Sequence, residues 1–107
     1  MRLTRLGGDS ESGHSPTLFV SDTNPPAYIV QGWSTDRPDT IEIPHGLLSY
    51  LQPRTCLGAL LQDTGRGTFL LSGELVTDAE ALERMGLPSH ESAVEVPIGR
   101  QVRRDAA

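Results

Sequence analysis

The sequence contains no lysine: all nine basic residues are arginine, and fourteen acidic residues bring the net charge to −5. This charge is uneven, because residues 1–5 and 100–107 hold five arginines and one acid, whereas residues 6–99 hold four arginines and thirteen acids. An acidic body repels phosphate backbones, so we expect no broad nucleic-acid surface. The basic ends would form one patch only if the termini lie close together.

The sequence also has a single cysteine, Cys56, which excludes an internal disulfide. No stretch approaches the ~20 apolar residues of a membrane-spanning helix, so we expect no membrane association. Residues 1–8 lack the continuous apolar segment of a secretion signal. These features together predict a reducing, cytoplasmic location.

Aromatic residues are scarce at 5%, and hydrophobic residues reach only 36%, whereas eleven glycines and eight prolines indicate many turns. A length of 107 residues predicts a single domain, residues 1–107, with one modest core. A turn-rich composition of this kind is typical of a mainly β protein.

The clearest organisation in the chain is an internal repeat with two offsets. The first offset, a shift of 41 residues, takes residues 18–23 onto 59–64 and residues 27–32 onto 68–73. The second offset, a shift of 53 residues, takes residues 40–44 onto 93–97. The repeat predicts two β-β-β units, at about residues 17–48 and 56–100, within one domain. The second offset is the longer, because the second unit carries an additional segment between its second and third strands.

The repeat predicts the fold class: a mainly β (α+β) protein in which the duplicated units form a small six-stranded antiparallel barrel or sandwich with one short helix. Closure into a barrel would hide the edges that six short strands otherwise expose. If the sheet stays open, an edge strand is the natural place for a homodimer contact.

Apolar residues bounded by turn-forming residues predict the individual strands. A glycine near the end of the second strand, Gly32, indicates a bulge or a close approach of two backbones. We further expect an edge strand at residues 1–6, a helical turn at 46–52, and flexible segments at 7–15 and from 98 onward, above all 101–107. The six repeat strands are Thr17–Ser21, Ala27–Trp33, Thr40–Ile43, Cys56–Gln62, Thr68–Leu71 and Ala93–Val96.

The additional segment of the second unit predicts a helix near residues 78–85. Thr77 and Glu80 have the spacing of a capping box, in which each side chain bonds the other residue's backbone N–H. Gly86 suits the left-handed position just past the helix end. We expect Ala79 and Met85, together with Leu82 between them, to face the sheet.

Candidate metal ligands and nucleophiles are few. His14, His45, Cys56 and His90 are scattered along the chain, and their spacings match no metal-binding motif. Cys56 starts a predicted strand and is expected to be a small buried residue rather than a reactive thiolate. We therefore predict no metal site and no cofactor.

One pair of carboxylates keeps the question of enzymatic activity open. Asp22 and Asp63 occupy equivalent places in the two units, so a pseudo-symmetric fold would let them approach and shift each other's pKa. The alternative is that each aspartate caps its own turn. The turn at Gly65–Gly67 joins two strands and lacks the helix N-terminus of a phosphate-binding loop.

Three residues are predicted to bind a protein partner: Trp33, Tyr28 and Arg66. Exposed Trp and Tyr side chains often anchor protein interfaces. Trp33 corresponds to Glu74 in the other unit, so a shared core does not require it. The alternative for Trp33 is packing against the helix or against the 46–52 segment.

Three motifs resemble those of small uncharacterised proteins from high-GC Gram-positive bacteria. The motifs are Asp63–Thr68, Thr77–Leu82 and Val94–Pro97, which lie within residues 63–97, about a third of the chain. Such proteins are commonly encoded beside helix-turn-helix regulators. The resemblance implies a regulatory or accessory role and brings no known activity with it.

A second stretch, Ala81–Pro88 followed by a Val-Glu-Val strand, is similar to swapped-hairpin transition-state regulators, which bind DNA as dimers. The basic loop of that family is missing, because residues 57–97 hold only Arg66 and Arg84. Our leading hypothesis is thus a non-catalytic regulatory or protein-interaction module of a bacterial cytoplasmic system. The alternatives are a dimeric DNA-binding regulator and a small enzyme or ligand binder with a cleft between the repeats.

Overall fold

The computed structural model describes residues 1–8 and 15–100. Of the predicted flexible segment at residues 7–15, Gly7 and Gly8 belong to a strand, and residues 9–14 lie outside the described residues. The predicted flexible tail at 101–107 also lies outside them.

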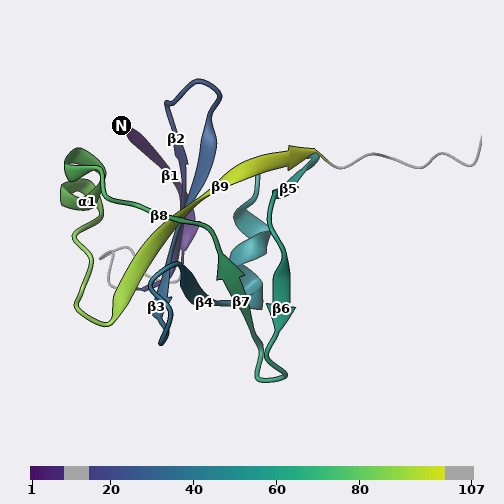
Figure 1. Cartoon of the computed structure of the whole chain (residues 1–107). Helices are drawn as coiled ribbons and strands as arrows, with labels where there is room; N and C mark the ends of the chain where they lie inside the picture. The colour runs from purple at the N-terminus through teal and green to yellow at the C-terminus, as the bar shows by residue number, and fades with distance from the viewer. Residues whose placement is uncertain (9–14, 101–107) are drawn as a thin grey trace, which may run out of the picture.

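The described residues form nine strands, one 3-10 helix and one α-helix (Figure 1). This confirms a mainly β protein with one short α-helix. The 3-10 helix overlaps the predicted helical turn. The elements are β1 (Leu3–Gly8), β2 (Thr17–Ser21), β3 (Ala27–Ser34), β4 (Thr40–Pro44), η1 (His45–Tyr50), β5 (Thr55–Leu57), β6 (Leu61–Asp63), β7 (Thr68–Ser72), β8 (Glu74–Leu75), α1 (Ala79–Met85) and β9 (Glu91–Arg100).

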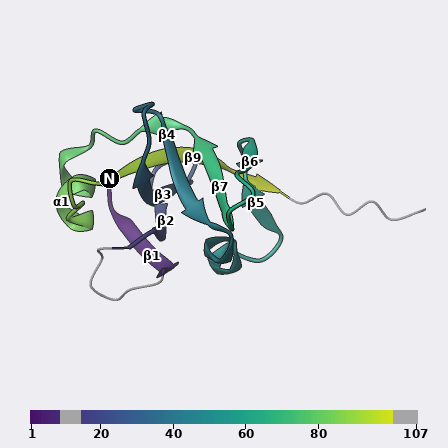
Figure 2. The same ribbon diagram turned by 90° about the horizontal axis from the view of Figure 1, so that it is seen from below.

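The strands form one strongly bent antiparallel sheet, with the path β1-β2-β3-β4-β7-β6 (Figure 2). Strand β9 pairs with β3 along the side of β3 that β2 leaves free, and it also pairs with β5 and β8. The sheet is not a closed barrel, because β1 and β6 each pair with a single strand among the described residues. The barrel or sandwich that the sequence predicted is therefore not shown.

The two halves of the chain pair with each other in a reciprocal manner. In the ladder of β3 with β9, Tyr28 lies opposite Val96, and in the ladder of β7 with β4, Phe69 lies opposite Ile43. The first offset of the predicted repeat takes Tyr28 onto Phe69, and the second takes Ile43 onto Val96. All the pairs of the β4–β7 ladder follow this relation.

Two glycines mark equivalent bends. A Cβ atom on Gly32 would lie 2.7 Å from the carbonyl oxygen of Glu42, and one on Gly73 would lie 2.8 Å from that of Glu95. The close backbone approach predicted at Gly32 is confirmed, and the same two offsets relate the two contacts. The registers agree with a duplicated unit, but the duplication itself stays a prediction.

The first strands of the two units do not correspond as the sequence alignment predicted. Phe19 is buried, whereas Leu60, which the first offset equates with it, is 92% exposed and precedes β6. The turns explain the difference: residues 21–27 separate the last paired residues of β2 and β3, but only the shorter segment 64–68 separates those of β6 and β7. In the ladders, Phe19 therefore corresponds to Gln62.

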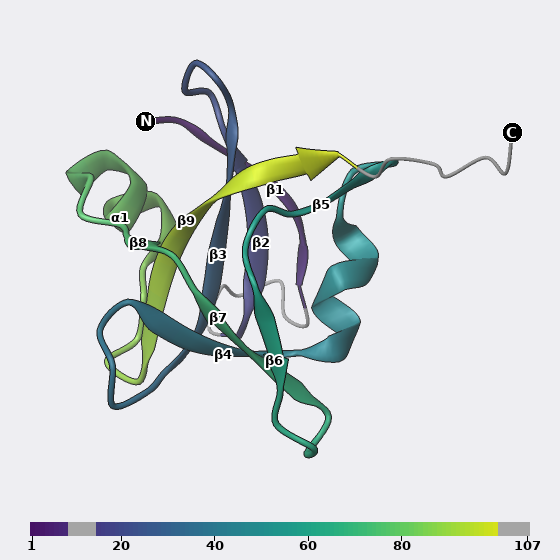
Figure 3. The same cartoon turned by 45° about the vertical axis from the view of Figure 1, so that its right-hand side comes forward.

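Two apolar clusters hold the fold together. The larger lies on the inner face of the sheet, and its fully buried members include Val30, Ile43 and Leu71. The smaller lies on the outer face of β2, β3 and β9, where α1 covers Phe19 and Ile29. Figure 3 shows α1 and η1 at opposite sides of the molecule.

Helix α1 begins one residue later than the capping box predicted. Its N-cap is Asp78, whose carboxylate accepts the backbone N–H of Ala81 at 2.9 Å, and this hydrogen bond lowers the pKa of Asp78. Ala81 and Met85 are buried and Leu82 packs against the same cluster, whereas Ala79 is exposed, outside the cluster that it was predicted to join. Gly86 ends the helix at φ 58° and ψ 48°, the left-handed conformation that the sequence predicted.

The last strand is longer than predicted, because Ile98–Arg100 pair with β5 instead of fraying. The strand predicted at Cys56–Gln62 is instead broken into β5 and β6. At the break, the Gly58 N–H still donates to the Pro97 carbonyl of β9 at 2.8 Å. Among the helices of the described residues, none has the length and apolar character needed to cross a bilayer.

Candidate functional site

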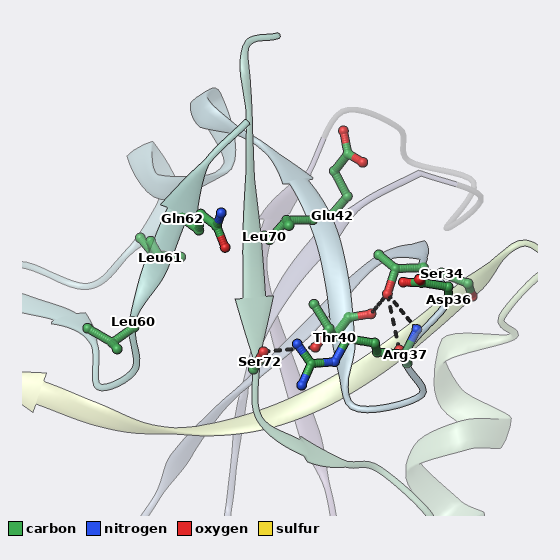
Figure 4. Close-up of a pocket in the computed structure, with 11 residues that line it drawn as sticks. Ser34, Asp36, Arg37, Thr40, Glu42, Leu60, Leu61, Gln62, Leu70 and Ser72 are labelled. Atoms are coloured by element: carbon green, nitrogen blue, oxygen red, sulfur yellow. Dashed lines mark hydrogen bonds between the residues drawn. The ribbon is translucent and has the colours of Figure 1, made fainter. Parts of the chain in front are cut away.

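A groove of about 770 Å³ lies on the outer face of β4, β7 and β6, on the half of the sheet that α1 does not cover. Figure 4 shows residues of the β6 segment on one side of it and residues of the β3–β4 loop on the other. The lining residues are Ser34, Thr35, Asp36, Arg37, Thr40, Glu42, Leu60, Leu61, Gln62, Leu70 and Ser72.

Strand alternation determines which side chains form the floor of this groove. Glu42, Leu70 and Gln62 lie side by side across β4, β7 and β6, so they share the outer face. Their neighbours along the strands, Ile41 and Leu71, point inward and are fully buried. The groove is thus the reverse side of the main core, built on strands that the core holds in place.

Apolar surface that nothing in the described chain covers lies on the floor and along one side of the groove. Leu60 is 92% exposed, the largest exposed fraction among the large hydrophobic side chains described. Leu61 and Leu70 are half-buried and also line the groove. Exposed apolar surface gathered in a concavity is typical of an interaction site.

The β3–β4 loop forms a wall that its own hydrogen bonds hold in place. The Thr35 hydroxyl donates to the Thr40 carbonyl at 2.7 Å and accepts the Arg37 N–H at 3.1 Å. The Thr40 N–H donates to the Arg37 carbonyl at 3.1 Å. At the floor, the hydroxyls of Thr40 and Ser72 bond each other at 2.8 Å.

The charged groups of the groove differ in their exposure and in their contacts with the rest of the chain. Glu42 accepts the Thr68 hydroxyl at 2.6 Å and lies 3.4 Å from the Arg66 guanidinium. Asp36 and Arg37 are both exposed on the loop. The groove therefore offers one carboxylate and one guanidinium beside an apolar floor.

Strand β6 leaves backbone groups open at the edge of the sheet. The Thr64 N–H bonds the Thr68 carbonyl at 3.0 Å, and bonded pairs alternate along an antiparallel ladder. Gln62 is therefore the bonded residue of β6, and the backbone N–H and C=O groups of Leu61 and Asp63 point away from β7. An open edge of this kind can accept a further strand.

The structure separates the three residues that the sequence predicted for partner binding. Tyr28 is fully buried, and its hydroxyl accepts the Gln52 N–H at 2.9 Å, so its side chain does not reach the surface. Trp33 is half-buried at the end of β3. Arg66 is exposed in the β6–β7 turn and lies beside the groove through its ion pair with Glu42.

The aspartates that the repeat placed in equivalent positions have different partners, and only Asp63 bonds its own turn. Asp22 accepts the Arg2 N–H at 2.8 Å, and Asp63 accepts the Gly65 N–H at 2.9 Å. Asp63 thus caps its own turn, as one of the two alternatives predicted. His45 lies 3.4 Å from Asp63 on the exposed surface.

The remaining candidate ligands do not gather. Within residues 1–8 and 15–100, no group of three or more His, Cys, Asp or Glu side chains is placed to hold a metal ion. His14 lies outside the described residues. Cys56 is a half-buried free thiol, and the His90 ring lies 3.3 Å from the carboxylate of the adjacent Glu91.

Sequence reasoning missed two features. Gln31 and Glu91 form a buried polar pair, in which the amide donates to the carboxylate at 2.9 Å, on the face covered by α1. Sequence reasoning also missed the groove, although Leu60 is an apolar residue just after a glycine-containing break. The signal lay in Gly58, which interrupts the predicted strand.

Comparison of the chain with protein-family models, with curated proteins and with solved structures finds no match. The resemblances to small bacterial proteins and to swapped-hairpin regulators therefore stay predictions.

Proposed function

We propose that this chain is a non-catalytic protein-interaction module of a bacterial regulatory system, and that it binds its partner in the groove on β4, β7 and β6. The observation that carries the proposal is the 92% exposure of Leu60 on one side of a groove whose other side is the β3–β4 loop. An exposed large apolar side chain beside a groove is typical of an interaction site, where a partner covers it.

The proposal includes the internal duplication. The reciprocal ladders of β3 with β9 and of β7 with β4 support two β-β-β units related by a pseudo-two-fold axis. The equivalent contacts of Gly32 and Gly73 support it independently, because each glycine meets the matching carbonyl of the other ladder.

A small-molecule binder is the second candidate, since the groove volume of about 770 Å³ falls within the range of ligand sites, roughly 300–1,000 Å³. The exposed charges of Asp36 and Arg37 would then orient the ligand. A protein partner is favoured, because the groove opens along the edge of β6 and its apolar floor continues onto the exposed Leu60.

The test compares two exposed leucines in tagged full-length chains expressed in cells of the source organism. Leu60→Asp places a charge in the groove, and Leu75→Asp is the matched control, because Leu75 is also exposed, at 42%, but lies outside the groove on β8. Proteins that co-purify with each chain are identified by mass spectrometry, and the leading partner is purified for binding measurements.

We expect a partner that is recovered with the wild type and with Leu75→Asp and is lost with Leu60→Asp. With purified proteins, Leu60→Asp should raise the dissociation constant at least about tenfold, since a central apolar anchor contributes more than about 1.4 kcal/mol. Equal binding by all three chains, or no recovered partner, would contradict the proposal.

A further inference from the structure

The two outer faces of the sheet are built alike, but only one is covered. On the covered face, Ile29 of β3 and Ala93 of β9 are buried beneath Ala81 and Met85 of α1. This face is closed by a segment of the chain itself, and it forms the smaller apolar cluster.

The groove is the counterpart of that covered face. The ladder registers equate Ile29 with Leu70 and Ala93 with Thr40, and both Leu70 and Thr40 line the groove. The same relation equates Gln31, which is fully buried, with Ser72, which is exposed. The groove therefore lies where α1 lies on the other half.

The connections between strands show why the groove is open. The long segment 76–93, which includes α1, joins the paired residues Leu75 and Val94. Only the short segment 35–40 joins the equivalent paired residues Ser34 and Ile41. The shorter connection has no room for a helix, so it supplies only the wall of the groove.

We infer that the groove binds a short amphipathic helix from a partner protein, about two turns long, in the position equivalent to α1. This inference rests on the proposed function and names the form of its ligand. The apolar stripe of the helix packs on Leu60 and Leu70, and its polar edge meets the hydroxyls of Thr40 and Ser72. A basic residue on its flank pairs with the exposed carboxylate of Asp36.

The partner is a different protein with a basic surface rather than a second copy of this chain. The α1 helix of each copy is already buried against its own sheet through Ala81 and Met85. Two copies with a net charge of −5 each also repel, whereas a basic partner is attracted.

The test uses defined peptides and the isotope-labelled full-length chain in NMR titrations. The probes are hydrocarbon-stapled two-turn peptides with arginines on the polar face and Ala, Leu, Met or Phe varied at the apolar positions. Peptides of the same composition with two prolines, which cannot form a helix, represent an extended ligand. Binding is also measured with the variants Leu70→Asp and Leu75→Asp.

We expect saturable shifts of the Thr40, Leu70 and Ser72 amide signals with at least one stapled peptide, and none with its proline-containing partner. Leu70→Asp should weaken this binding at least about tenfold and Leu75→Asp by less than about twofold. Binding of the extended peptides alone at these residues would overturn the helical ligand while leaving the interaction module intact. Shifts confined to the α1 face, or no saturable binding by any stapled peptide, would overturn the inference.

The proposed function fails separately, in the co-purification test, if no partner depends on Leu60. A partner that depends on Leu60 but contacts it through an extended segment would overturn only the helical ligand.

Discussion

The two hairpins of this chain have matching ladders but different surroundings. The β2–β3 hairpin is covered on both faces, by the main core on one side and by α1 on the other, so that Phe19 and Ile29 are buried. The β6–β7 hairpin has the main core on one side only, and its outer residues Gln62 and Leu70 reach the surface. Besides their turns, the two hairpins differ in the length of the connection that would carry a covering helix.

The comparison shows that residue type follows register even where the covering differs. At equivalent ladder positions, the covered face holds Ile29 and Gln31, and the open face holds Leu70 and Ser72. The buried Gln31 has Glu91 as its partner at 2.9 Å, whereas Ser72 bonds a neighbouring hydroxyl and still reaches water. Retention of an apolar residue at Leu70, where water would favour a polar one, fits a face that is covered in a complex.

The largest expected difference between the faces comes from truncating the equivalent residues Ile29 and Leu70. Ile29→Ala should lower the free energy of unfolding by about 2–5 kcal/mol, because it leaves a cavity beneath α1. Leu70→Ala should lower it by less, about 1–2 kcal/mol, since this side chain is only half-buried on the open face. Urea denaturation of both variants measures the difference, and equal losses would show that the open face is packed like the covered one.

The bends should behave alike in the two halves. Gly32→Ala and Gly73→Ala each place a Cβ within 2.8 Å of a carbonyl oxygen, so each should lower the free energy of unfolding by about 1–3 kcal/mol. Gly46→Ala is the control, because a Cβ there meets no atom within 4 Å. Thermal unfolding compares the three variants. Losses at Gly32 and Gly73 that differ more than about twofold would argue against equivalent bends.

The smallest effect concerns the cap of the covering helix and depends on pH. The Ala81 N–H stabilises the Asp78 carboxylate, so the folded-state pKa of Asp78 lies below its ordinary value of 3.8. A lowered folded-state pKa contributes stability above the unfolded-state pKa, and this contribution is lost as pH falls through the folded-state value. Asp78→Ala should therefore lower Tm at pH 7 and lower it less once the pH falls below that ordinary value.

Asp78→Asn serves as the control for this titration, because asparagine caps a helix without ionising. Its melting curve should stay near that of the wild type at neutral pH. A Tm difference between wild type and Asp78→Ala that is the same at pH 7 and pH 2 would contradict the charged cap.

Much of the secondary structure was readable from local pattern. The strand limits of β2 are those predicted, and Gly86 stops α1 in the conformation that only glycine adopts readily. The two offsets of the repeat relate the residue pairs of one ladder to those of the other. These features depend on neighbours in sequence or on a repeated pattern.

The candidate site depended on features that the sequence does not display. Tyr28 was predicted on the surface, yet pairing of β3 with both β2 and β9 places it in the main core. Leu60 was predicted to match the buried Phe19, because the alignment ignored the difference in turn length between the hairpins. The groove itself forms where a loop and an edge strand from distant parts of the chain meet, so no single stretch predicts it.

The most direct test of the open face as a binding face is site-specific photo-crosslinking in cells of the source organism. The photoreactive residue p-benzoyl-phenylalanine replaces Leu60 in one chain and Leu75 in the other, since both positions are exposed. The account predicts a crosslink from position 60 to one defined partner protein, and none to that partner from position 75. Crosslinking of the same partner from position 75 with none from position 60 would contradict it.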